Sequence, residues 1–301
     1  MATTSLPRAT RRPRMLLRWR QVLGRAGLHL FLAAAALYVL FPLWWAFSSS
    51  LKGSKELYST NPSLLPLHPS WANYTGTLWG MFNVVQQVGN SFIVTGGTVF
   101  LTALLATLAG YGFARIRFRG RDLIFIIFLL SLFIPQSGGL MAAYELMSFL
   151  HLRNNLLGLI LAFSAGLTVP VFIMRQSFLA LPNELDDAAR IDGATRWQFF
   201  WRIGVPLVSA GITVVAIFTF ISAWGEYLFT YTMEDKQSLY TLAVAVAQTE
   251  IPNAAFNDVP QFSAYGAEAA IAIMGAAPAI AIFVLLQKWF VRGLAEGALK
   301  F

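Results

Sequence analysis

Apolar residues gather in six long runs along the chain, separated by polar segments of unequal length. A helix needs about 20 predominantly apolar residues to cross a lipid bilayer. Each run is long enough for one such helix, so the pattern predicts an all-α, polytopic membrane protein with six transmembrane helices. We expect these helices at residues 27–49, 90–114, 123–147, 155–180, 205–229 and 267–290.

Helix-breaking residues interrupt two of these runs. Pro135, Gln136, Gly138 and Gly139 lie within the third run, and Pro170 lies within the fourth. Such breaks are tolerated at membrane depth where neighbouring helices or a cavity satisfy the freed backbone groups. The third and fourth helices are therefore the least regular of the six that the pattern predicts.

Basic residues are distributed unevenly between the two sides of the predicted helices, and this orients the chain. Seven arginines and no acidic residue lie within residues 1–26. Lysine and arginine accumulate in cytoplasmic segments, so we expect the N-terminus in the cytoplasm. Six crossings then place the C-terminus there too. Four of the 22 basic residues would lie outside, namely Lys52, Lys55, Arg153 and Lys236.

The same pattern divides the chain into three parts. We expect a basic cytoplasmic N-terminal tail at residues 1–26, a transmembrane domain at residues 27–292 and a cytoplasmic C-terminal tail at residues 293–301. Two outside loops, at about 50–89 and 230–266, are long enough to fold and to contact a partner.

The composition narrows the class of protein further. Hydrophobic residues make up 57% of the chain and charged residues only 12%, about half the charged fraction of an average soluble domain. The absence of cysteine excludes disulfides and thiolate metal sites. The histidines, His29, His68 and His151, are far apart and form no metal-binding pair. We therefore expect no metal site, and we expect each histidine to be structural.

The net charge of +8 invites comparison with nucleic-acid-binding proteins. Such proteins cluster their basic residues on one soluble face. Here the basic residues follow the inner side of the predicted helices, as in membrane proteins generally. We therefore expect a lipid bilayer around the chain and no nucleic-acid partner.

The inside loop at residues 181–207 has the pattern of a helix, a break and a second helix. Asn183 is a favourable N-cap, and acidic residues such as Glu184 follow it in the first turn. Gly193 suits the left-handed position that ends a helix. Thr195 is placed to cap the second helix. We therefore expect two short helices joined at Gly193.

The faces of these two helices predict a docking element. The first helix has a face of mostly small residues, which would allow another protein to approach closely. The second helix has large aromatic residues. An amphipathic helix lying at the membrane surface is the alternative interpretation. The small-residue face consists of Leu185, Ala188, Ala189 and Asp192, and the aromatic residues are Trp197, Phe200 and Trp201.

The spacing in this loop resembles the EAA loop of ABC importer permeases. Residues 187–189 (Asp-Ala-Ala) are followed after three residues by Gly193, after nine more by Ile203, and after one more by residues 205–206 (Val-Pro). The family pattern has glutamate at the first position and leucine before the proline. In that family the loop is the coupling helix that fits a cleft of the cytoplasmic ATPase, so the resemblance implies this role for residues 184–201. It assigns ATPase coupling to Glu184, Asp187, Ala188, Ala189, Asp192, Gly193, Trp197, Phe200 and Pro206.

Further segments resemble the carbohydrate branch of the same family, particularly its MalG-like subunit. They lie at residues 90–91, 108–115, 191–194 and 287–300. The resemblance implies a subunit of the cell inner membrane that translocates a sugar or oligosaccharide by alternating access. Its implied partners are ATP-binding cassette ATPase subunits, a second permease subunit and an external solute-binding protein.

The chain lacks the sequence features of an ATP-hydrolysing enzyme. A phosphate-binding loop needs a Gly-Lys pair, and none of the five lysines follows a glycine. We therefore expect a non-catalytic subunit without a cofactor, with ATP bound by the partner ATPase. No cluster of Asp, His and Glu on an inside loop supports a membrane enzyme such as a glycosyltransferase.

An acidic residue in the fifth predicted helix is a candidate for the substrate pathway. Glu226 is flanked by Trp224 and Tyr227, and sugar sites combine aromatic faces with carboxylate acceptors. The carbohydrate branch often has Trp-Asn-Glu here, whereas this chain has Gly225 in the middle position. Two alternatives remain open: a hydrogen bond that holds Glu226 to Ser222 or to the partner subunit, and an ion-coupled secondary transporter in which Glu226 is protonated.

Overall fold

The computed structural model of the chain describes residues 14–61, 63–77, 84–134, 136–248 and 263–298, and within these residues it is helical and has no strand. This agrees with the predicted all-α class. The helices are α1 (Arg14–Ser50), α2 (Ser54–Leu57), α3 (Ala72–Gly76), α4 (Val84–Arg115), α5 (Arg121–Leu130), α6 (Leu140–Phe149), α7 (Leu156–Ser164), α8 (Thr168–Leu179), α9 (Glu184–Ile191), α10 (Arg196–Phe199), α11 (Val205–Leu207), α12 (Ser209–Gly225), α13 (Leu228–Met233), α14 (Leu242–Gln248) and α15 (Ala264–Ala298).

Three of these helices are long and apolar enough to cross a membrane by themselves. They contain the segments Gly24–Ser50 of α1, Val84–Arg115 of α4 and Ala264–Leu285 of α15. Two bent pairs bring the count to at most five: α7 with α8, which are bent by 52°, and the helical run Arg196–Leu207 with α12, which are bent by 72°. Length and composition therefore support three to five spans among the described residues.

The third predicted helix, at residues 123–147, is not continuous. α5 ends at Leu130, short 3₁₀ turns follow, and α6 begins at Leu140. Gly138 and Gly139 lie in this break, where their conformational freedom disfavours a regular helix. Pro135 lies outside the described residues. The fifth predicted helix is also shorter than expected, because α12 ends at Gly225.

The two predicted tails are partly helical. α1 begins at Arg14, within the predicted N-terminal tail, and α15 continues to Ala298, within the predicted C-terminal tail. The helices therefore extend beyond the lengths that the apolar runs alone predict.

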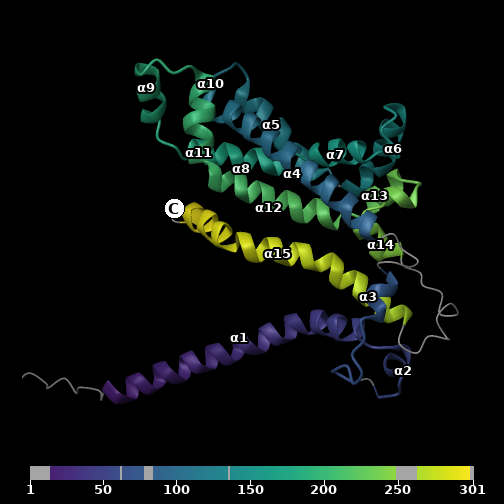
Figure 1. Cartoon of the computed structure of the whole chain (residues 1–301). Coiled ribbons are helices and arrows are strands. Elements are labelled where there is room, and N and C mark those ends of the chain that lie inside the picture. Colours follow the sequence, from purple (N-terminus) through teal and green to yellow (C-terminus); the bar gives the residue numbers. More distant parts are fainter. Residues whose placement is uncertain (1–13, 62, 78–83, 135, 249–262, 299–301) are drawn as a thin grey trace, which may run out of the picture.

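The central helix of the bundle is α4, which packs against α8, α12 and α7 (Figure 1). The contact with α8 is close: a Cβ atom added at Gly110 would lie 2.5 Å from Cβ of Met174. Small residues allow membrane helices to approach in this way. The absence of a side chain at Gly110 therefore allows α4 and α8 to pack closely at this point.

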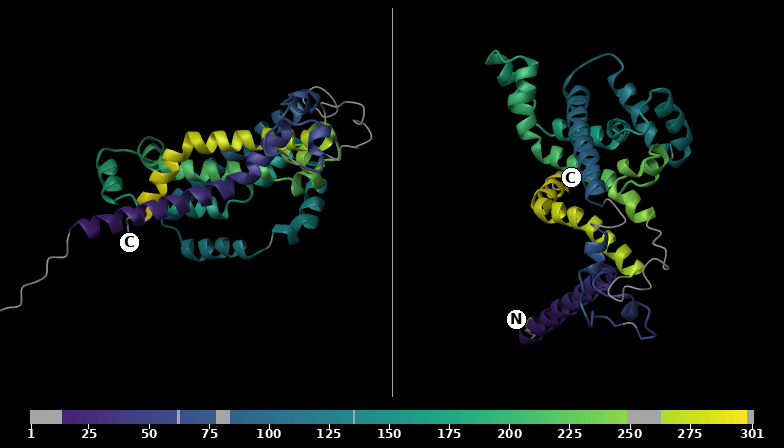
Figure 2. Two further views of the ribbon diagram at one scale, coloured as in Figure 1. Left: turned by 90° about the horizontal axis from the view of Figure 1, so that it is seen from below. Right: turned by 45° about the vertical axis from the view of Figure 1, so that its right-hand side comes forward.

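The two ends of the bundle carry different elements (Figures 1 and 2). α9 and α10 lie at one end, together with the start of α1 and the end of α15. The elements α2, α3, α6, α13 and α14 lie at the opposite end. We call these the α9 end and the α13 end of the molecule.

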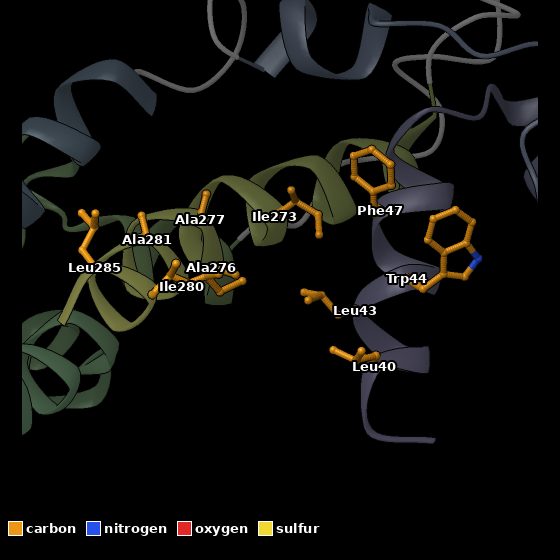
Figure 3. Close-up of a pocket in the computed structure, with 11 residues that line it drawn as sticks. Leu40, Leu43, Trp44, Phe47, Ile273, Ala276, Ala277, Ile280, Ala281 and Leu285 are labelled. Atoms are coloured by element: carbon orange, nitrogen blue, oxygen red, sulfur yellow. The ribbon is translucent and has the colours of Figure 1, made fainter. Parts of the chain in front are cut away.

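α1 lies apart from the central bundle and approaches it through α15. Side chains from both helices line an apolar groove of about 750 Å³ between them, including Leu43 and Trp44 of α1 and Ile273 and Ile280 of α15 (Figure 3). Large apolar side chains of α1 such as Tyr38 are exposed. Such a surface suits hydrocarbon or another membrane helix.

Candidate functional site

The first helix of the predicted docking segment ends as its sequence predicts. Gly193 has a φ of +77°, in the left-handed region that favours glycine. The N–H of Ala194 donates to the carbonyl of Ala189 at 2.9 Å, and the N–H of Gly193 donates to the carbonyl of Arg190 at 3.0 Å. These two bonds form the Schellman motif, which satisfies the last carbonyls of α9. The predicted stop at Gly193 is confirmed.

The second helix begins with the predicted cap. The hydroxyl of Thr195 accepts a hydrogen bond from the N–H of Gln198 at 3.2 Å, and the side-chain oxygen of Gln198 accepts one from the N–H of Thr195 at 2.8 Å. This reciprocal capping box satisfies two N–H groups at the helix start. A π-helical turn, Phe200–Gly204, continues α10 into α11. Two local motifs thus fix the bend between α9 and α10.

The prediction that the side chain of Asn183 caps the first helix is wrong. Asn183 precedes α9, but its backbone is helical, with φ −69° and ψ −26°, and its side chain accepts no hydrogen bond from α9. A capping side chain normally extends from a residue with extended backbone. The Oδ1 atom of Asn183 instead accepts a hydrogen bond from Nη1 of Arg115 at 2.8 Å.

The predicted small-residue face of α9 is divided between the interior and the surface. Ala189 is buried and Leu185 is half-buried, and both pack into the core of the bundle. Asp187 and Ala188 are exposed, and Ile191 is 87% exposed. The surface that α9 offers to a partner therefore centres on Asp187, Ala188 and Ile191.

The aromatic residues after α9 divide in the same way. Trp197 is 60% exposed, and Trp201 is also exposed. Phe200 is only 1% exposed and packs against Tyr111 and Phe178, with ring-centroid distances of 5.0 and 6.2 Å. Phe200 therefore fixes the segment to the bundle, while the two tryptophans remain available at the surface.

The remaining residues predicted for coupling lie at the surface of the same segment. Glu184 is the exposed first residue of α9, and Asp192 is its exposed C-cap. Pro206 is exposed in the first turn of α11. Glu184 and Asp192 therefore lie at the α9 end, and Pro206 lies further along the same segment, in α11.

Trp224, predicted for the substrate pathway, is a packed side chain. Its Nε1–H donates to the carbonyl of Gly275 in α15 at 2.8 Å. Its ring stacks on Phe220 and meets the edge of Phe92, with centroid distances of 5.4 and 5.1 Å. Trp224 therefore ties α12 to α15 and α4 by hydrogen bonding and aromatic packing.

Glu226 lies at the break between α12 and α13. The Oε1 atom of Glu226 accepts a hydrogen bond from the N–H of Phe229 at 2.7 Å, in the first turn of α13. Its partner is thus Phe229 and not Ser222. Tyr227 is exposed beside it, and Glu226 itself is partly exposed. The break therefore leaves the carboxylate of Glu226 partly exposed and Tyr227 exposed.

The structure also shows a cluster of polar side chains at the α13 end, which the sequence analysis did not predict. Nη2 of Arg153 donates to both carboxylate oxygens of Asp235 at 2.9 and 3.0 Å. Asn154 exchanges two further hydrogen bonds with Asp235. Glu234 is 1% exposed, and its Oε1 accepts the N–H of Asn155 at 3.2 Å. We call these five residues the outer cluster.

The outer cluster is incompletely satisfied. Among the described residues, Oε2 of Glu234 and Nε of Arg153 are buried without a hydrogen-bond partner. Burial raises the pKa of Glu234 from its ordinary value of 4.5 to about 7, with a smaller contribution from Asp235 in the same direction. The N–H of Asn155 opposes this rise. The described residues contain no group of three or more His, Asp or Glu side chains arranged to hold a metal ion.

Comparisons with known proteins place the chain among transport proteins. A family model described as "Binding-protein-dependent transport system inner membrane component" matches residues 102–296. The arabinooligosaccharides transport system permease protein AraQ of Bacillus subtilis (strain 168) is 30% identical over 92% of this chain and 96% of AraQ. The galactooligosaccharides transport system permease protein GanQ of the same organism is 33% identical over 90% of this chain and 94% of GanQ. The sn-glycerol-3-phosphate transport system permease protein UgpE of Yersinia pestis bv. Antiqua (strain Antiqua) is 30% identical over 89% of this chain and 95% of UgpE.

A solved structure shares the fold. It is a chain of a bacterial ABC transporter involved in the import of the acidic polysaccharide alginate. It superposes with a TM-score of 0.81 at 22% identity, over 95% of this chain and 100% of that chain.

Proposed function

The chain belongs to the family of binding-protein-dependent transport system inner membrane components, and on this premise we propose that it imports a sugar or oligosaccharide across the cytoplasmic membrane. The family membership confirms the resemblance to ABC importer permeases. The proposed cargo rests on the names of its relatives, two of which are oligosaccharide permeases. The UgpE relatives are named for the transport of sn-glycerol-3-phosphate. A phosphorylated polyol is therefore the second candidate for the cargo.

The α9–α10 segment is the proposed coupling element. One observation carries this proposal: two short helices, held at a fixed bend by a Schellman motif and a capping box, present exposed residues such as Ile191 and Trp197 at one end of the bundle. Because the angle between α9 and α10 is fixed, a displacement of α9 by a partner would move the helices that follow it. ATP-driven closure of a partner ATPase would thus move the bundle and alternate access to a site within it.

We propose that the chain crosses the membrane six times. The third crossing would consist of α5, the short turns and α6, and the α9 end would lie in the cytoplasm. In Figure 1, the start of α1 and the end of α15 lie at the α9 end, which supports cytoplasmic termini. The boundaries of the tails at 1–26 and 293–301 and of the permease domain at 27–292 belong to this proposal.

The partners follow from this arrangement. We expect ATP-binding cassette subunits at the α9 end, a second permease subunit beside the helices, and an external solute-binding protein at the α13 end. ATP would bind to the ATPase subunits, and the permease itself would carry no cofactor.

The substrate pathway is proposed to pass the break after α12. Glu226 and Tyr227 are accessible there, whereas Trp224 would act by holding α12 in place. The hydrogen bond from the N–H of Phe229 gives the carboxylate of Glu226 a capping role. This role accounts for an acidic residue at this position without ion coupling.

Reconstitution tests the proposal. The chain, its ATPase subunits, the second permease and the binding protein would be placed in proteoliposomes. Arabinose- and galactose-containing oligosaccharides and sn-glycerol-3-phosphate would then be tested for stimulation of ATP hydrolysis and for uptake. We expect an oligosaccharide to stimulate both, and uptake to stop without ATP. Uptake that persists without ATP but stops when the ion gradient is collapsed would contradict the proposal.

A further inference from the structure

The C-terminus of α4 carries a guanidinium group that uses all of its donors. Nε of Arg115 donates to the carbonyl of Phe178 at 3.1 Å, and Nη2 donates to the carbonyls of Phe178 and Leu181. Nη1 donates to Oδ1 of Asn183 at 2.8 Å and to Oδ2 of Asp186 at 2.7 Å. Arginine has five N–H donors, so each of them is satisfied within this chain.

These acceptors lie in α8, in α9 and in the turn between the two helices. Phe178 lies in the last turn of α8, where the final carbonyls lack partners within the helix and carry the negative end of its dipole. Asp186 lies in the first turn of α9, and Asn183 directly precedes that helix. One side chain therefore joins α4, α8 and α9 at the point where the coupling segment leaves the bundle.

The position of Arg115 is unusual for a cation at a helix end. Its side chain is 7% exposed, whereas Arg117 and Arg119, the next arginines along the chain, are exposed. A buried cation is costly unless an ion pair and hydrogen bonds compensate for its desolvation. Here Asp186 and the three carbonyl contacts supply that compensation. Lysine, a point charge with three donors, could not satisfy the same acceptors.

The opposite end of α4 is tied to the α13 end of the molecule. The side-chain amide of Asn90 donates to the carbonyls of Ser238 and Tyr240 at 2.8 and 3.0 Å. The hydroxyl of Ser91 accepts the N–H of Leu242 at 2.8 Å. α4 is one continuous helix between these contacts and Arg115. It is therefore a direct mechanical connection between the two ends.

We propose that Arg115 is the positioning residue that makes α9 move as one body with α4 and α8, so that displacement of the coupling segment reaches the α13 end through α4. This inference rests on the proposed function, because it assumes that an ATPase acts on α9. Closeness of α9 to α4 does not by itself show that the two helices are coupled. The test must therefore show that they move together.

Spin-label distances test the rigid unit without knowledge of the sugar. Labels would be attached to Ile191→Cys on α9 and Phe100→Cys on α4, both exposed positions in a chain without native cysteine. In the complete transporter with Arg115, we expect one narrow distance distribution that is the same with and without ATP. In Arg115→Lys, the distribution should broaden and shift with ATP. An unchanged narrow distribution in Arg115→Lys would overturn the proposal.

The transport assay supplies the functional readout. With the oligosaccharide that stimulates hydrolysis best, uptake per ATP hydrolysed should fall about tenfold in Arg115→Lys, the factor expected for losing a charge-assisted hydrogen bond. Arg117→Lys, the matched control, should keep the wild-type ratio. If Arg115→Lys does not insert, Asp186→Asn keeps the side-chain shape and should lower the ratio in the same direction. A wild-type ratio in both variants would overturn the proposal.

Failure of this inference is distinguishable from failure of the proposed function. A photo-cross-linker on Ile191→Cys reports whether α9 contacts the ATPase, and it does so independently of Arg115. A cross-link together with unchanged distances in Arg115→Lys would leave the proposed function standing and remove Arg115 from it. Absence of the cross-link would contradict the coupling role of α9 itself.

Discussion

The two ends of the molecule are each held together by an arginine, but the two networks differ in how completely they are satisfied. At the α9 end, Arg115 is buried and all five donors have acceptors, three of them backbone carbonyl contacts. At the α13 end, Arg153 pairs with Asp235, whose side chain is 63% exposed. Nearby, Oε2 of Glu234 is buried without a partner.

The two networks therefore differ in how easily they can be deformed. A fully satisfied network of charge-assisted hydrogen bonds has one favourable geometry and resists deformation. A network with a buried, unpaired carboxylate oxygen can gain stability by taking up a proton or by rearranging. The network at the α9 end therefore suits the proposed transmission of movement, whereas the network at the α13 end is the one that a change of pH can alter.

The largest effect is expected from breaking the bend at the α9 end. A branched side chain in the left-handed region costs about 1–2 kcal/mol, which corresponds to roughly a tenfold loss of the docked geometry. Gly193→Val should therefore abolish most sugar uptake while ATP hydrolysis continues, as measured in proteoliposomes. Space does not limit this substitution, because no atom lies within 4 Å of the added Cβ.

Gly120→Val is the matched control for this prediction. Gly120 has a φ of +78° and precedes α5, outside the α9–α10 segment. The two substitutions impose the same kind of backbone strain, but only one of them strains the coupling element. Equal loss of uptake in both variants would show that general destabilisation, and not the bend, is responsible.

The second effect concerns the unpaired carboxylate at the α13 end. Because the pKa of Glu234 is raised to about 7, the folded protein holds a proton that the unfolded chain releases as the pH rises above 4.5. This contribution to stability is present at low pH and is lost as the pH rises through about 7. The Tm of the purified protein should therefore fall between pH 5 and pH 8.

Glu234→Gln tests this assignment, because glutamine matches the neutral acid in shape and does not titrate. The variant should show a smaller fall in Tm over the same pH range than the wild type. Asp235, Arg153 and Lys236 are the other charged groups around Glu234, and they remain unchanged in the variant. Identical pH profiles for the two proteins would refute the role of Glu234.

The smallest effect is expected from the exposed ion pair. Asp235→Asn removes the charge that faces Arg153, and exposed pairs contribute about 0–1 kcal/mol. The same substitution at Asp186, whose partner Arg115 is buried, should lower the Tm more. The Tm of both variants would be measured, and a larger fall for Asp235→Asn than for Asp186→Asn would contradict the assignment of the stronger network to the α9 end.

Patterns within short stretches of the sequence predicted much of the fold and of the candidate site. The apolar runs predicted the long helices α1, α4 and α15, because length and hydropathy decide whether a segment can span a bilayer. The stop at Gly193 and the cap at Thr195 were also predictable. Both depend on residues within a few positions of each other.

Long-range contacts account for what the sequence could not predict. Asn183 has the residue type of an N-cap, but Arg115, distant in the sequence, takes its oxygen. Phe200 is buried because Tyr111 and Phe178 lie beneath it, which no periodicity within the loop reveals. The signal available for Arg115 was its place at the end of the motif at residues 108–115, where the sequence shows an arginine but not its acceptors.

Cross-linking can show whether α9 contacts the ATPase subunit. A maleimide photo-cross-linker would be attached to Ile191→Cys on α9, a position that is 87% exposed. It would be activated in the assembled transporter, and the products identified by mass spectrometry. Ser238→Cys, exposed at the α13 end, is the control. We predict a cross-link from position 191 to the ATPase subunit and none from position 238. Absence of the cross-link from position 191, or a cross-link to the ATPase from position 238 alone, would contradict the coupling role of α9.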